Sequence, residues 1–94
     1  MTALYNGVTA DQTGTPFTPA GNFKIAASDD NGYWQGVKLI LRESNDGGAT
    51  FPNVIHIFER NESKVVEAAT LTQYRLDVQN VNAQNAMSAD WEAL

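Results

Sequence analysis

The fold is decided by residues 36–51, which read GVKLILRESNDGGATF. In the first half of this stretch, apolar side chains at every second position alternate with Lys38 and Arg42. That period-two pattern is typical of a strand with one buried face. The Asp-Gly-Gly triplet at 46–48 tolerates positive φ angles, so the chain can reverse direction there. Phe51 then opens a second apolar run, and the stretch predicts a β-hairpin.

Further strand patterns lie on both sides of this hairpin. They are separated by segments rich in Gly, Asn, Asp and Ser, which favour turns. The sequence therefore predicts an all-β fold, a single small antiparallel β-sandwich of about six or seven strands (immunoglobulin-like or jelly-roll-like), occupying residues 1–94. Besides the hairpin strands at 37–41 and 54–58, the expected strands are Thr2–Val8, Asn22–Ser28, Lys64–Ala68 and Gln73–Asn80.

The last residues, 84–94, fit two patterns. In a strand, one face would carry Met87, Ala89 and Trp91. In a helix, one face would carry Met87, Trp91 and Leu94. Because six strand candidates precede this tail, we expect a seventh strand.

The composition restricts the class of protein. The chain has 94 residues, 43% hydrophobic and 18% charged, with a net charge of −5 and no cysteine. The cations do not cluster, which disfavours nucleic-acid binding. No apolar run approaches the roughly 20 residues that span a bilayer. Without disulfides the fold must rely on packing, which fits assembly in a reducing cytosol.

The N-terminal residues 1–20 differ from the rest of the chain. After the first expected strand, residues 10–21 carry two prolines, two glycines and three threonines, a composition typical of a loop or extended connection. Such a segment can be a surface loop, or an arm that lies across a neighbouring subunit. The composition is compatible with both interpretations.

Three segments, taken in their order along the chain, resemble small β-sandwich proteins of tailed-phage virions. These are Trp34-Gln35-Gly36 with the alternating strand after it, the turn Ser44–Phe51, and Tyr74-Arg75-Leu76. The resemblance covers about residues 21–80; Phe51 stands where tryptophan is more usual, and residues 1–20 match no part of the pattern. It implies a non-enzymatic virion structural protein: a capsid decoration (cement) protein, a head fibre or a tail component.

The turn itself also matches the Asp-box pattern of many β-hairpins. In that pattern an aspartate accepts backbone N–H bonds and an aromatic residue packs beneath the turn. A single copy is a structural device and does not indicate glycosidase activity. The expected turn residues are Ser44, Asp46, Gly47, Gly48, Thr50 and Phe51.

Candidate catalytic and metal-binding residues are few. His56 is the single histidine and lies within an apolar run, with no nucleophile and orienting carboxylate nearby in sequence. One histidine without cysteines does not supply a usual zinc site. Asp29-Asp30-Asn31 offers hard oxygen ligands but lacks the EF-hand pattern, so we expect it to form a turn. We therefore expect no catalytic, cofactor or metal site.

Aromatic residues in loops and near the chain ends are the candidates for protein contacts. The proposed contact residues are Tyr5, Thr15, Pro16, Phe17, Tyr33, Trp34 and Trp91. The expected partner is a major capsid protein or another virion protein, in a particle assembled in the bacterial cytoplasm. Self-association is also expected, with a homotrimer favoured. A third possibility is a glycan-binding module that uses Tyr33-Trp34 beside Asp29-Asp30-Asn31.

Overall fold

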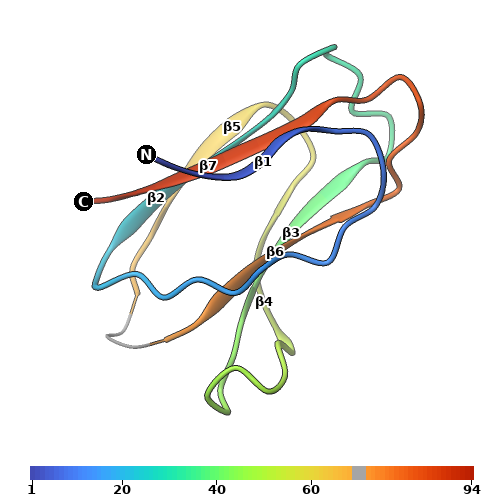
Figure 1. The fold of residues 1–94 in the computed structure, drawn as a ribbon. Helices are drawn as coiled ribbons and strands as arrows, with labels where there is room; N and C mark the ends of the chain where they lie inside the picture. The colour runs from blue at the N-terminus through green and yellow to red at the C-terminus, as the bar shows by residue number, and fades with distance from the viewer. Residues whose placement is uncertain (69–71) are drawn as a thin grey trace.

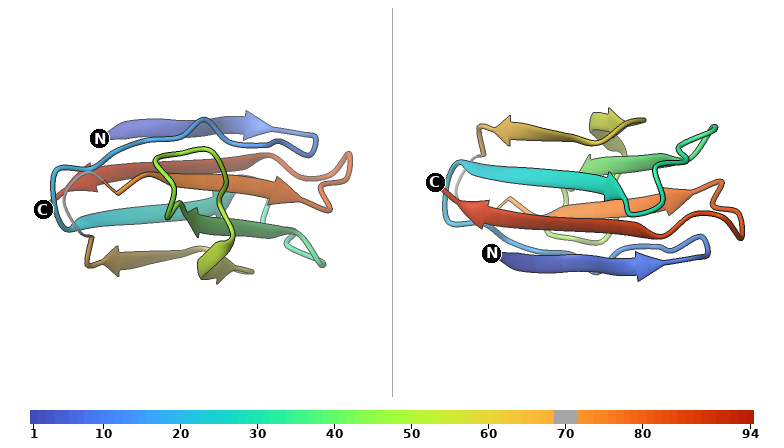
Figure 2. Two further views of the ribbon diagram at one scale, coloured as in Figure 1. Left: turned by 90° about the horizontal axis from the view of Figure 1, so that it is seen from below. Right: turned by 90° about the horizontal axis from the view of Figure 1, so that it is seen from above.

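The computed structural model describes residues 1–68 and 72–94, and these ranges contain seven strands and no helix. The strands form two antiparallel sheets packed face to face (Figures 1 and 2), so the predicted small β-sandwich is confirmed. The strands are β1 (Thr2–Val8), β2 (Phe23–Asp29), β3 (Lys38–Glu43), β4 (Asn53–Phe58), β5 (Glu62–Val66), β6 (Tyr74–Gln79) and β7 (Met87–Ala93).

The two sheets differ in size and order. The four-stranded sheet has the order β1-β7-β2-β5, and the three-stranded sheet has the order β4-β3-β6. In a constant-type immunoglobulin domain the seventh strand belongs to the same sheet as the third and sixth. Here β7 lies instead between β1 and β2, and another part of the chain covers the open edge of β6.

The segment beside β6 is residues 12–17. It makes two isolated antiparallel bridges, Gln12 with Val78 and Phe17 with Tyr74, and each bridge carries backbone hydrogen bonds of 2.9–3.0 Å. The chain therefore leaves β1 on one sheet and returns along the edge of the other (Figure 1). Within the chain, the Thr/Pro-rich segment is an extended edge of the three-stranded sheet.

Alternation explains the core between the sheets. Leu39 and Leu41 of β3 are fully buried, and β2 buries every second residue. Burial of these apolar faces is the main force that holds two sheets together. The largest fully buried apolar side chains are Phe23, Ile25, Leu39, Leu41, Phe58, Tyr74, Leu76 and Met87.

Two expectations about the second half of the chain have clear outcomes. Residues 87–93 are a strand, because their backbone pairs with β1 on one side and with β2 on the other. Strand β5 begins at Glu62, two residues before the expected start, because the polar turn after β4 is shorter than predicted. Asn61 ends that turn, and its side-chain oxygen accepts the backbone N–H of Asp29 at 3.0 Å.

Candidate functional site

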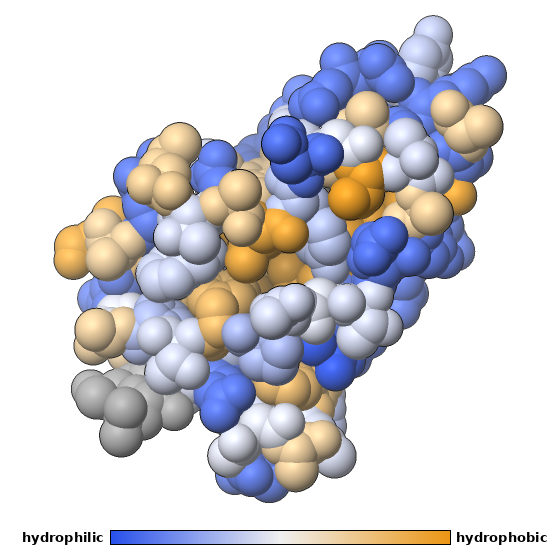
Figure 3. Space-filling view, in the orientation of Figure 1, coloured by the Kyte–Doolittle hydropathy of each residue, from blue (hydrophilic) through white to orange (hydrophobic). Residues whose placement is uncertain are grey.

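An apolar groove opens along one side of the sandwich, between β1 and residues 12–17, which we call the edge segment. Its volume is about 290 Å³, and it includes five of the seven predicted contact residues. In Figure 3 apolar surface lies in the middle of this side, between more polar borders. The groove is lined by Thr2, Ala3, Leu4, Tyr5, Gly14, Thr15, Pro16, Phe17, Leu76 and Trp91.

Aromatic side chains connect the two sheets inside this groove. The Tyr5 hydroxyl on β1 donates a 2.5 Å hydrogen bond to the carbonyl of Leu76 on β6. Phe17 stacks on Trp91 with ring centroids 5.2 Å apart. Burial and the nearby Asp77 charge raise the pKa of Tyr5 to about 12, with Arg75 opposing. The phenol therefore stays neutral and remains a donor at ordinary pH.

Trp91 leaves one polar atom unsatisfied at this groove. Its indole Nε1 is buried and has no hydrogen-bond partner among the described residues. Buried donors without a partner are uncommon in native proteins and cost about 1–3 kcal/mol each. The unsatisfied donor thus belongs to a residue that lines the groove, although the Nε1 atom itself is buried.

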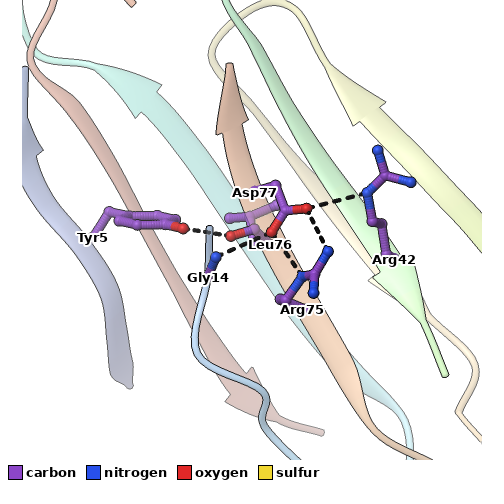
Figure 4. Close-up of polar contacts among 6 residues, drawn as sticks. All are labelled: Tyr5, Gly14, Arg42, Arg75, Leu76 and Asp77. Carbon is purple, nitrogen blue, oxygen red and sulfur yellow. Dashed lines mark hydrogen bonds and ion pairs between the residues drawn. The ribbon is translucent and has the colours of Figure 1, made fainter. Parts of the chain in front are cut away.

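Asp77 joins the edge segment to the outer face of the three-stranded sheet (Figure 4). Its carboxylate accepts the Gly14 N–H at 3.0 Å, Arg42 Nε at 3.1 Å and Arg75 Nε at 2.9 Å. Gly14 can approach so closely because it lacks a side chain, since a Cβ there would overlap the Leu76 carbonyl. Sequence reasoning missed this cluster because its members come from three separate segments.

The other two predicted contact residues lie away from the groove. The Trp34 ring packs partly buried against the core, and its Nε1 donates to the Asn61 side chain at 2.8 Å. Tyr33 is 48% exposed. The nearby Asp29 is 3% exposed and its carboxylate is already bonded by protein donors.

The turn at 44–51 has the local bonds expected from its sequence. Asp46 accepts the Thr50 amide at 2.9 Å and the Thr50 hydroxyl at 2.6 Å, and Ser44 Oγ accepts the Gly48 amide at 2.8 Å. Gly47 and Gly48 have φ angles of 75° and 98°, which glycine adopts without strain. Phe51 is 7% exposed, and the guanidinium carbon of Arg75 lies 4.8 Å from the centroid of the Phe51 ring.

His56 links the sheets on the side opposite the groove. Its Nε2 lies 2.9 Å from Glu62 Oε1, and its ring meets Phe58 edge-on at 4.6 Å. The described residues contain no group of three or more His, Cys, Asp or Glu side chains that could hold a metal ion. They also include no helix with the length and apolar character needed to span a membrane.

Comparisons of the chain with protein-family models, with curated proteins and with solved structures gave no significant match.

Proposed function

We propose that this protein is a non-enzymatic structural protein of a tailed-phage virion, and that it decorates and stabilises the outside of the capsid. The proposal rests on the sequence resemblance and on the apolar groove between β1 and residues 12–17. The groove is the observation that carries it, because it gathers partly exposed aromatic side chains on a scaffold of packed sheets.

The segments that carry the resemblance occupy neighbouring positions in the fold. Residues 34–36 lead into β3, residues 44–51 connect β3 to β4, and residues 74–76 open β6. All three belong to the three-stranded sheet or its loops. This clustering supports treating them as one pattern and not as three unrelated coincidences.

The groove supports a passive binding role. Aromatic side chains in partly desolvated pockets contribute most of the binding energy at many protein interfaces. Because Trp91 Nε1 is buried, a carbonyl oxygen of a bound segment reaches this donor only if the side chains around it move on binding. Many identical copies on a shell add their effects, so modest affinity per copy is sufficient.

Self-association is proposed through the edge strand β4. Val54, Ile55 and Ile57 are 49%, 36% and 38% exposed, and β4 pairs with β3 alone among the described residues. Exposed apolar edge strands without charged residues readily pair with further strands. A homotrimer is the favoured assembly.

Purified capsids prepared with and without the protein test the decoration role. We expect the decorated capsids to withstand higher temperature before they release DNA. Equal thermal stability of the two preparations would remove the cement role. Imaging that places the chain on a stalk or on the tail would favour a head-fibre or tail component instead.

Two threonines provide a matched test of the groove. Thr15 lines the groove, whereas the exposed Thr18 does not. Thr15→Glu should reduce capsid occupancy at least about ten-fold, because burial of an unpaired charge costs several kcal/mol. Thr18→Glu should bind like the wild type. Equal binding of both variants would contradict a role for the groove.

Trp91→Phe separates folding from binding. The variant keeps a ring for Phe17 and removes the unsatisfied N–H, so we expect thermal stability within about 1 kcal/mol of the wild type. Capsid affinity should fall about three- to ten-fold if a partner carbonyl bonds to Nε1. Unchanged affinity would exclude that bond.

Glycan binding is the second candidate, favoured by the exposure of Tyr33. A glycan array tests it directly. Binding that is lost in Tyr33→Ala would support it, and an array without saturable binding would dismiss it.

A further inference from the structure

The two outer faces of the sandwich carry opposite charge. Register places Lys38, Arg42, Arg75 and Asp77 on the outer face of the three-stranded sheet, because their strand neighbours point into the core. This face therefore has an excess of two positive charges in a chain whose net charge is −5. On the outer face of the four-stranded sheet, Asp90 and Glu92 outnumber Lys24.

The Arg42 side chain is held in position, but only part of its hydrogen-bonding capacity is used. Asp77 accepts its Nε at 3.1 Å, while its terminal nitrogens make no hydrogen bond to any described residue. Figure 4 shows these nitrogens directed away from Asp77. The side chain is 23% exposed. Its planar pair of donors matches the two oxygens of a carboxylate, and fixing the side chain in advance reduces the entropy lost on binding.

Apolar side chains lie beside this cation on the same face. Val54 is opposite Arg42 in the β3–β4 register, and Ile57 is opposite the buried Ile40. Val54 and Ile57 are 49% and 38% exposed. A partner that covers them would also exclude water from the guanidinium, and a charged hydrogen bond strengthens when water is excluded.

We propose that the outer face of the three-stranded sheet is a docking surface for a protein segment in which an acidic residue is flanked by aliphatic residues. The carboxylate would form two parallel hydrogen bonds with the terminal nitrogens of Arg42, and the flanking side chains would cover Val54 and Ile57. The complementary charge selects an acidic partner. This surface is separate from the groove, and its use does not depend on the groove's partner being a capsid.

A pair of blocked peptides tests the proposal with the full chain. The probe is acetyl-Ser-Val-Glu-Leu-Ser-amide, and its control carries Gln in place of Glu. In NMR titrations we expect the acidic peptide to shift the Arg42 Nε–H signal and the β3 and β4 amides, with a Kd of about 1 mM. The Gln peptide should bind about ten-fold more weakly, because it forms no ion pair.

Three variants locate the contact. Arg42→Lys keeps the charge but loses the planar pair of donors, so peptide affinity should fall at least about five-fold. Val54→Ser should weaken binding about three- to ten-fold through lost apolar contact. Lys24→Gln, on the opposite face, is the matched control and should leave affinity unchanged. Capsid binding that persists in Arg42→Lys would distinguish this surface from the groove.

Several outcomes would overturn the proposal. One is the absence of a saturable shift at peptide concentrations about five-fold above the expected Kd. Equal affinity for the Gln and Glu peptides would also exclude the Arg42–carboxylate contact. So would a loss of peptide affinity in Lys24→Gln as large as that in Arg42→Lys. Self-association at the β4 edge would shift β4 amides in the absence of peptide. A concentration-dependent shift of the Arg42 Nε–H signal without peptide would instead assign this face to a second copy of the chain. A stronger response to a DNA oligonucleotide than to the peptide would assign it to nucleic acid.

Discussion

Two aspartates organise the connections of this sandwich in different ways. Asp46 is exposed, and its bonding partners Ser44 and Thr50 lie within four residues of it in sequence. Asp29 is 3% exposed and joins its own turn to the loop before β7, through Ala86 and the side chain of Asn85. Hydrogen bonds to a carboxylate thus stabilise a single turn at Asp46, whereas at Asp29 they join two loops that are distant in the sequence. The second set of bonds should therefore matter more than the first for the stability of the whole sandwich.

The largest expected effect is that of Asp29→Ala. The substitution leaves the amides of Asn31, Tyr33 and Ala86 and the side chain of Asn85 without their acceptor. Because the Asp29 carboxylate and the Asn85 side chain are buried, we expect a loss of about 2–4 kcal/mol in the free energy of unfolding. Urea denaturation measures it. A loss below about 1 kcal/mol would contradict the tertiary role of Asp29.

Asn85→Ala should cost about 1–3 kcal/mol, because Asn85 is 1% exposed and bonds to Asp29 and to the Tyr33 carbonyl. A double-mutant cycle sharpens the comparison. Asn85 and Asp29 should couple by at least about 0.5 kcal/mol, whereas Asn85 and Asp46 should be additive. Equal coupling in the two cycles would show that the turns are not independent.

Acid should weaken both turns. Hydrogen bonds from the Thr50 hydroxyl, the Thr50 amide and Ser44 lower the pKa of Asp46 to about 2. Burial opposes ionisation of Asp29, but its hydrogen bonds outweigh burial and lower its pKa too. In the unfolded chain an aspartate carboxyl has a pKa of about 3.9 and is half-protonated at that pH. The stability from these groups is therefore complete above about pH 5 and is lost progressively as the pH falls through 4 toward 2.

Denaturation at pH 4, 3 and 2 measures this dependence. Asp46→Ala should flatten the profile over this range, because it removes a carboxyl that binds protons less tightly in the folded chain than in the unfolded one. A profile identical to the wild type would contradict the lowered pKa.

The smallest expected effect is that of Asp46→Ala on stability at neutral pH. The residue is exposed and water can replace its partners, so the denaturation midpoint should fall less than in either buried variant. Amide shifts should stay confined to residues 44–51 in a heteronuclear NMR spectrum. Changes at β2 or β7 would show that this turn also carries long-range contacts.

The same contrast explains what the sequence predicts. The first six strands, the buried face of β3 and the bonds of the 44–51 turn follow from local patterns, because alternation and turn chemistry act over a few residues. The local pattern of residues 87–93 also fits a helix, and pairing with β1 and β2 makes them a strand. The partnership of Asp29 with Asn85 spans 56 residues, and no local signal indicates it. The buried Ile40, on the outer face of β3, likewise depends on neighbours from other strands.

The candidate sites follow the same rule. Residue type alone marked Tyr5, Phe17 and Trp91 as aromatic candidates, but their meeting in one groove depends on the edge segment returning along β6. The alternating pattern indicates only that Arg42 lies on the polar face of a strand. Its fixed orientation depends on Asp77, which the hairpin pattern does not include.

The pairing of β1 with β7 and of residues 12–17 with β6 has a consequence for synthesis. Thr2 pairs with Trp91, and Phe17 pairs with Tyr74. Residues 2–17 are synthesised before residues 74–93, so they stay without these partners until residues 74–93 have emerged from the exit tunnel. Closure of the sandwich is then a late event, and slow folding dominated by contacts between distant parts of the chain is expected. Until that moment Tyr5 lacks its acceptor on Leu76, and Phe17 lacks the ring of Trp91.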